Sequence, residues 1–121
     1  MAASCHEGTF QKKNSLNRQI ESYMDAHIKT ASLAELAEHL NYSRAYTSRL
    51  IGKLYGESFS ELLQRKRCAL AAHLLRETEL PVGEIIRAAG YENGNFFRRR
   101  FRQIYGKNPL EYRHFMKQSS V

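Results

Sequence analysis

The chain has 121 residues, which is enough for one ordinary domain or two very small ones and excludes a large multi-domain enzyme. It carries 19 Lys and Arg against 12 Asp and Glu, a formal net charge of +7, and this excess favours a polyanionic partner, nucleic acid first and an anionic membrane surface second. Its 42% of hydrophobic and 26% of charged residues are typical of a globular chain, and its few Gly (7) and Pro (2) favour a mostly helical fold.

Residues 1–14 show no periodicity and are predicted to form a flexible tail or the end of a linker. Residues 15–57 are predicted to form a first helix-turn-helix subdomain. Its first helix is indicated by apolar residues that fall on one stripe, at Leu16, Ile20, Tyr23, Met24 and Ile28. A capping box, in which Ser32 precedes Glu35 by three residues, opens the second helix.

The third helix of this subdomain is predicted to begin after its cap, Ser43, and to end at Gly56, which supplies a left-handed residue. Its predicted inward residues are Tyr46, Thr47, Leu50, Ile51 and Leu54. A linker helix within residues 58–78 follows, with about 17 residues and so a length of roughly 25 Å. It leads into a second helix-turn-helix subdomain over residues 79–121.

The second subdomain repeats the first. Glu35 and Tyr42 recur 49 residues later as Glu84 and Tyr91. After one extra turn residue the offset becomes 50, and it pairs Arg49 with Arg99, Tyr55 with Tyr105, Gly56 with Gly106 and Glu61 with Glu111. Asn108 and Pro109 open the last helix as its cap and first helical residue. The sequence therefore predicts an all-α fold of two homeodomain-like, three-helix units.

Each copy has a short helix, a tight turn and a second helix with a polar, basic outer face, which is the helix-turn-helix layout. In that layout the second helix enters the major groove of DNA. The outward residues of the two second helices are Arg44, Ala45, Ser48, Arg49 and Lys53, and Gly94, Asn95, Arg98, Arg99 and Arg102. Arg can form two hydrogen bonds with guanine and Asn two with adenine, and a small Ala can contact the methyl group of thymine. Phosphate contacts are predicted for Arg44, Lys53, Arg102 and Lys107.

Three other interpretations compete with this one. A basic helix face is often only solvated surface, although two copies of the pattern favour a function. The aromatic side chains of Phe96, Phe97, Phe101 and Tyr105 would suit single-stranded nucleic acid, but their helical spacing favours core packing, with Phe96 alone half exposed. The chain would also suit the DNA-targeting part of an enzyme whose catalytic part lies elsewhere.

The second copy closely resembles the signature of the AraC/XylS family of transcriptional regulators. Residues 90–102 resemble the family's glycine-aromatic turn and paired-aromatic recognition helix, and residues 106–113 resemble its Gly-x-x-Pro-x-x-aromatic-Arg ending. Upstream, Arg67, Ala71, Leu74 and Leu75 match its linker helix, so the likeness covers about residues 16–116.

The resemblance implies seven helices in two helix-turn-helix subdomains joined by a linker helix, and a promoter-binding regulator, chiefly of the activator kind. It implies base-reading roles for Ala45, Ser48 and Arg49 in the first copy, and for Asn95, Arg98 and Arg99 in the second, with Gly94 at the mouth of that helix.

The first copy departs from the family pattern. Thr47 replaces a large aliphatic residue and Ile51 an aromatic one, so looser packing is expected. Gly52 replaces a basic residue, which removes a phosphate contact and costs about 1 kcal/mol of helix propensity relative to Ala. Because Ala45 and Ser48 are short, the first copy is expected to discriminate bases weakly and the second to dominate affinity.

The sequence thus predicts a sequence-specific duplex-DNA-binding domain of a transcription regulator, probing two adjacent major grooves. The alternative is a mixed module in which one helix pair binds DNA and the other contacts RNA polymerase or another protein.

No catalytic constellation, metal-ligand spacing, cofactor, small-molecule site or membrane segment is expected. Cys68 is expected to pack as an inert thiol, and the location to be cytoplasmic and nucleoid-associated. The chain is either a stand-alone regulator or the C-terminal piece of a longer one, and residues 10–13 favour the piece. The operator, the effector, the sign of regulation and the oligomeric state stay open.

Overall fold

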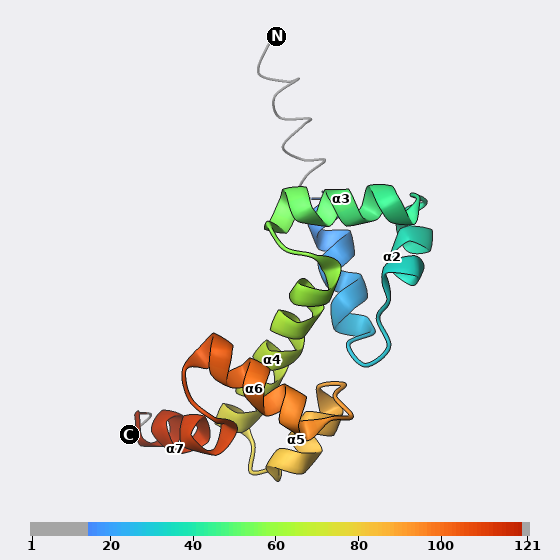
Figure 1. The fold of residues 1–121 in the computed structure, drawn as a ribbon. Helices are drawn as coiled ribbons and strands as arrows, with labels where there is room; N and C mark the ends of the chain where they lie inside the picture. The colour runs from blue at the N-terminus through green and yellow to red at the C-terminus, as the bar shows by residue number, and fades with distance from the viewer. Residues whose placement is uncertain (1–14, 120–121) are drawn as a thin grey trace. The chain divides into compact units, whose positions relative to one another are not determined.

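The computed structural model describes residues 15–119, which form seven helices and no strand (Figure 1). This confirms the all-α prediction, while the predicted tail over residues 1–14 lies outside the described residues. The chain divides into two compact units. Among the described residues, the first unit comprises residues 15–27 and 31–59, and the second comprises residues 28–30 and 60–119. No helix of the described residues is long and apolar enough to cross a bilayer.

The described part of the first unit contains three helices. They are an N-terminal helix over residues 15–26, α2 (Leu33–Leu40) and α3 (Arg44–Tyr55). Its buried side chains come from all three helices and include Ile20, Tyr23, Met24, Leu36, Ala37, Leu40, Thr47 and Ile51. The hydroxyl of Thr47 is satisfied inside this core, because it donates to the backbone oxygen of Ser43 at 2.8 Å.

Two details of the predicted pattern were wrong. The N-terminal helix ends before Ile28, which lies in the turn that follows. Tyr46, predicted to face inward, is 45% exposed. The buried stripe of α3 runs through Thr47 and Ile51, one turn apart, and Tyr46 lies outside it on the solvent side.

A tyrosine hydroxyl completes the first capping box. Ser32 caps α2 as predicted, because its Oγ accepts from the backbone N–H of Glu35 at 3.1 Å. The Glu35 carboxylate does not reach back to the N–H of Ser32. That N–H donates to the hydroxyl of Tyr23 at 3.0 Å, and the same hydroxyl donates to the carboxylate of Glu35 at 3.2 Å. The start of α2 is therefore tied to the N-terminal helix.

Gly52 and Gly56 offer a stability test within one helix, because a Cβ at either position would meet no heavy atom within 4 Å. Gly52 lies inside α3, whereas Gly56 is its C-cap with φ of 69°. We expect Gly52→Ala to raise the free energy of unfolding by about 0.5–1 kcal/mol and Gly56→Ala to lower it by about 1–2 kcal/mol. Urea unfolding of both variants measures this, and a loss of stability in Gly52→Ala would contradict the expectation.

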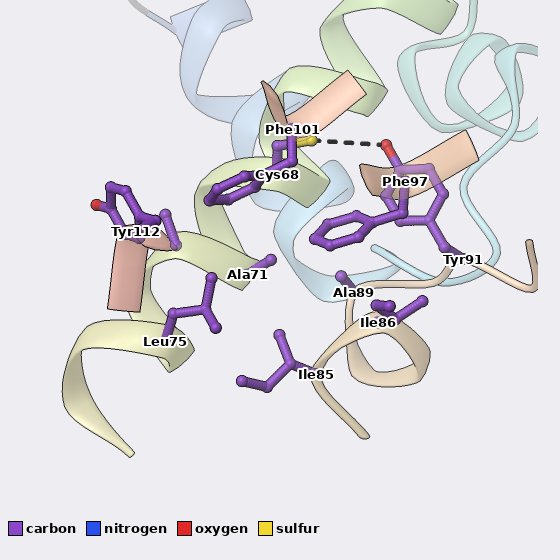
Figure 2. Close-up of a cluster of buried hydrophobic side chains, with 11 residues drawn as sticks. Cys68, Ala71, Leu75, Ile85, Ile86, Ala89, Tyr91, Phe97, Phe101 and Tyr112 are labelled. Atoms are coloured by element: carbon purple, nitrogen blue, oxygen red, sulfur yellow. Dashed lines mark hydrogen bonds between the residues drawn. The ribbon is translucent and has the colours of Figure 1, made fainter. Parts of the chain in front are cut away.

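The second unit contains most of α4 (Phe59–Glu77), with α5 (Val82–Ala88), α6 (Gly94–Tyr105) and α7 (Pro109–Ser119). The 19 residues of α4 give a length of about 28 Å. Figure 2 shows the core of this unit, whose buried residues are Cys68, Ala71, Ala72, Leu75, Ile85, Ile86, Ala89, Tyr91, Phe97, Phe101 and Tyr112. Phe97 and Phe101 are fully buried, which confirms core packing over a stacking platform, and Phe96 is 44% exposed as predicted.

Cys68 is fully buried in this core, as predicted. Its sulfur lies 3.9 Å from the hydroxyl of Tyr91 (Figure 2). Burial raises the pKa of the Cys68 thiol and also that of the Tyr91 hydroxyl, so both groups stay neutral near pH 7. A neutral, buried thiol packs as a small apolar group and is a poor nucleophile.

Arg113 ties the last helix of the second unit to α4. Its Nε donates to the backbone oxygen of Leu75 at 3.1 Å, and its Nη2 donates to that of Thr78 at 3.2 Å. The carbonyls at the end of a helix lack intrahelical partners and carry partial negative charge. Arg113 therefore caps the C-terminal end of α4 with a positive charge.

Candidate nucleic-acid interface

The helix α3 is fixed at both ends by local hydrogen bonds, and at its C-terminal end the N–H of Gly56 donates to the oxygen of Gly52 at 2.9 Å. Asn41 takes a left-handed conformation with φ of 61°, and the N–H of Tyr42 bonds to the oxygen of Ala37 at 2.9 Å. The turn then places Ser43 as the cap of α3, where its Oγ accepts from the N–H of Tyr46 at 3.1 Å. This geometry confirms the predicted cap.

The helix α6 is built in the same way. Gly90 has φ of 92°, and the N–H of Tyr91 bonds to the oxygen of Ile86 at 3.1 Å. Asn93 caps α6, since its Oδ1 accepts from the backbone N–H groups of Asn95 and Phe96, at 3.0 and 3.2 Å. This cap was not predicted, although Asn93 lies 50 residues after Ser43, the offset of the second repeat.

The residues predicted to read bases form one exposed trio on each helix. Ala45, Ser48 and Arg49 of α3 are all exposed, and so are Asn95, Arg98 and Arg99 of α6. Both trios have the spacing i, i+3, i+4, which places three side chains on one face of a helix. The opposite face of α6 is buried through Phe97 and Phe101. The exposed positions agree with the prediction, while contact with bases stays a prediction.

Gly94 leaves room for one of these arginines. A Cβ at Gly94 would lie 3.0 Å from Nη1 of Arg98 and 3.7 Å from Cδ1 of Ile86. The guanidinium group of Arg98 therefore lies back over the first turn of α6, in space that a side chain at Gly94 would take.

The residues predicted to contact phosphates are less uniform. Arg44, Lys53 and Arg102 are exposed. Lys107 is half-buried, and its Nζ lies 4.9 Å from the ring centroid of Phe115. This cation–π contact holds the ammonium group near α7, so that Lys107 is less free to follow a DNA backbone than the other three.

The helices α3 and α6 also differ in charge from α2, α4, α5 and α7. Each of α2, α4, α5 and α7 has an acidic residue in its first turn, whereas α3 and α6 have none. The start of a helix carries partial positive charge, and an acidic side chain there offsets it. Neither α3 nor α6 contains any Asp or Glu, while α6 carries four arginines. Both helices therefore present uncompensated positive charge, which suits an anionic ligand.

One of the four arginines of α6 faces elsewhere. Arg100 is half-buried, and its Nη1 donates to the Oε1 of Gln103 at 3.1 Å. Within residues 15–119, no three His, Cys, Asp or Glu side chains gather as ligands of a metal ion would.

Comparisons with known proteins agree with this arrangement. A family profile described as a helix-turn-helix domain matches residues 36–114. The regulatory protein SoxS of Salmonella typhimurium is 31% identical over 93 residues, which cover 76% of this chain and 87% of SoxS. The regulatory protein PocR of the same organism is 31% identical over 99 residues, which cover 81% of this chain and 33% of PocR. The chain thus spans most of one relative and about a third of the other.

A solved structure shares the fold over nearly the whole chain. It is a transcriptional regulator from Chromobacterium violaceum, described as a protein with an AraC-type DNA-binding domain. The two chains are 27% identical and superpose with a TM-score of 0.81, over 92% of this chain and 97% of the other.

Proposed function

We propose that α3 and α6 read base sequence in two successive major grooves of duplex DNA. The premise is that this chain belongs to the AraC/XylS family of helix-turn-helix transcription regulators. Family membership makes the chain a DNA-binding domain of a regulator and not an enzyme. The observation that carries the finer proposal is the pair of exposed trios, each on a capped helix without acidic residues. In this proposal residues 15–57 and 79–121 are the two reading subdomains, and residues 58–78 link them.

We assign sequence reading mainly to α6. Arg98 and Arg99 suit bidentate hydrogen bonds to guanine, and Asn95 suits adenine. On α3 only Arg49 has comparable reach, because Ala45 and Ser48 are short. The alternative, in which one unit contacts RNA polymerase instead of DNA, is not favoured, since the family match includes α3 and α6 alike. Activation of transcription, and a cytoplasmic location at the nucleoid, belong to the same proposal.

Selection from a random duplex pool, followed by footprinting, tests this function. We expect one preferred sequence with two protected major grooves on one side of the duplex, about one helical turn apart. Protection of a single groove would support the mixed module instead. Recovery of unrelated sequences with equal affinity would contradict sequence-specific reading altogether.

Salt dependence tests the proposed phosphate contacts. If Arg44, Lys53, Arg102 and Lys107 each neutralise one phosphate, the logarithm of the affinity should fall against the logarithm of salt concentration with a slope of about −3.6, since each contact contributes about −0.9. Lys53→Gln and Arg102→Gln should each make the slope shallower by about 1. A slope near zero in the wild type would contradict the set, and an unchanged slope in Lys107→Gln would remove Lys107 from it.

A further inference from the structure

Two exposed aromatic side chains occupy equivalent places in the two units. Tyr46 is 45% exposed and Phe96 is 44% exposed. They lie 50 residues apart, at the offset that relates α3 to α6, and each is the third residue of its helix. Single exposed apolar residues are common on proteins and need no explanation. An exposed aromatic ring at the same place in both repeats does need an explanation. The buried residues next to the two rings, Thr47 and Phe97, differ, so the likeness is confined to the exposed position.

Both rings are held in place by a second ring from the turn before the helix. Tyr46 packs edge-on against Tyr42, with ring centroids 4.8 Å apart and an interplanar angle of 61°. Phe96 packs against Tyr91 with centroids 6.1 Å apart and an angle of 44°. Because each ring is braced on one side and exposed on the other, it loses little conformational entropy when a partner covers it.

Each ring lies at the border of the proposed reading face of its helix, which is the side that carries the exposed trio, and each precedes the last arginine of that trio by three residues. Tyr46 directly follows Ala45 and precedes Arg49 by three residues, so it lies about 60° around the helix axis from Arg49. Lys53 follows Tyr46 by seven residues and is therefore almost in line with it, two turns further on. Tyr46, Arg49, Leu50 and Lys53 together line a shallow hollow on the surface of α3.

This position defines what the ring meets when the helix lies in a major groove. The centre of the reading face meets base edges, and its borders meet the sugar-phosphate walls of the groove. Lys53, in line with Tyr46, is a proposed phosphate contact. A ring on the same side of the helix has an apolar face for a deoxyribose, and the tyrosine hydroxyl is a donor for a phosphate oxygen.

We propose that Tyr46 and Phe96 are paired backbone contacts that pack against deoxyribose at the groove wall and set the depth and register of α3 and α6, with the Tyr46 hydroxyl donating to a phosphate. This inference rests on the proposed function. It assigns the two rings to affinity and positioning, not to the choice of base. The two rings also differ from the cationic contacts in their effect on salt dependence. Because an uncharged ring releases no counterion, its loss should leave the salt slope unchanged.

The test measures the affinity of variants for the selected duplex, for single-base variants of it and over a range of salt concentrations. Tyr46→Ala and Phe96→Ala should each weaken binding at least tenfold, by the same factor for every sequence and with the salt slope unchanged. Tyr46→Phe should weaken binding about three- to tenfold through loss of the hydroxyl alone. Phe96→Tyr should bind as well as the wild type or better.

Leu110→Ala is the matched control, because Leu110 is 66% exposed but lies on α7, and it should leave the affinity unchanged. Thermal unfolding of each variant checks that the fold persists. If the wild type has no preferred duplex, the proposed function fails. If the wild type binds its duplex and Tyr46→Ala and Phe96→Ala bind it equally well, only this inference is overturned. A loss confined to one base pair would also overturn it, since the ring would then read a base.

Discussion

Replacement of Arg99 by alanine should weaken binding to the selected duplex by about 1–3 kcal/mol, or roughly 5- to 150-fold, and remove the preference at one base step. Arg99 is exposed on α6, four residues after Asn95, and α6 has no acidic side chain to neutralise it. A bidentate pair with guanine is lost entirely when the guanidinium group is removed, and the guanine edge gains no other partner. Competition between the selected duplex and its single-base variants measures both effects.

Two further substitutions make this expectation specific. Arg99→Lys keeps the charge but cannot form the planar bidentate pair, so it should keep the salt slope while losing most of the base preference. Arg49→Ala changes the equivalent residue of the first unit and should cost less, because α3 is proposed to contribute less to sequence reading. If Arg99→Ala weakened binding to every sequence by the same factor, Arg99 would be a backbone contact.

The elements of this fold were predictable where they depend on neighbours in the sequence. Helical spacing and local caps placed α3 between Ser43 and Gly56, and the structure has it at Arg44–Tyr55. The exposure of Arg98 and Arg99 followed from the same period, since residues off the buried stripe of a helix face solvent. The repeat carried this reasoning from the first unit to the second.

What could not be predicted depends on residues that are distant in the sequence. The hydroxyl of Tyr23 enters the capping box of Ser32 and Glu35 only because the N-terminal helix packs beside the start of α2. Arg113 donates to the carbonyl of Leu75 in α4 and to that of Thr78 just after it, both more than 30 residues away along the chain. Periodicity gives the face of a helix, but it does not give the partner that covers the face or the border between buried and exposed. Tyr46 lies on that border, which is why its exposure was predicted wrongly.

A second large effect is expected at the turn before α6, where Gly90→Ala should lower the free energy of unfolding by about 2–5 kcal/mol. The backbone at Gly90 has φ of 92°, a conformation that costs other residues about 1–2 kcal/mol. A Cβ there would also lie 3.0 Å from the oxygen of Ile28, the Cα of Lys29 and the Nε of Arg67. Overpacking of this kind costs typically about 1–3 kcal/mol.

The crowded atoms cannot easily move away. Two of the three belong to the backbone, and the third is the donor that bonds to the oxygen of Ile28 at 2.8 Å. Arg67 also donates to the oxygen of Lys29 at 3.2 Å, and its Cζ lies 5.6 Å from the ring centroid of Tyr91. Burial lowers the pKa of Arg67, so a shift that broke these bonds would leave a partly desolvated cation without its acceptors.

The matched control for Gly90→Ala is Asn41→Ala, at the equivalent place in the first unit. Asn41 also has positive φ, 61°, but it is exposed, so alanine there should lose only the backbone preference, about 1 kcal/mol. Urea unfolding of the two variants separates strain from crowding, and equal losses would contradict the crowding at Gly90.

The Gly90→Ala variant should still bind DNA as the wild type does under conditions where it is folded. Because Gly90 precedes α6 and is outside the reading trio, the variant should keep the base preference and the salt slope of the wild type. Loss of stability without loss of base preference is the reverse of what Arg99→Ala should produce, so the two variants together separate the fold of the second unit from its proposed contact with DNA.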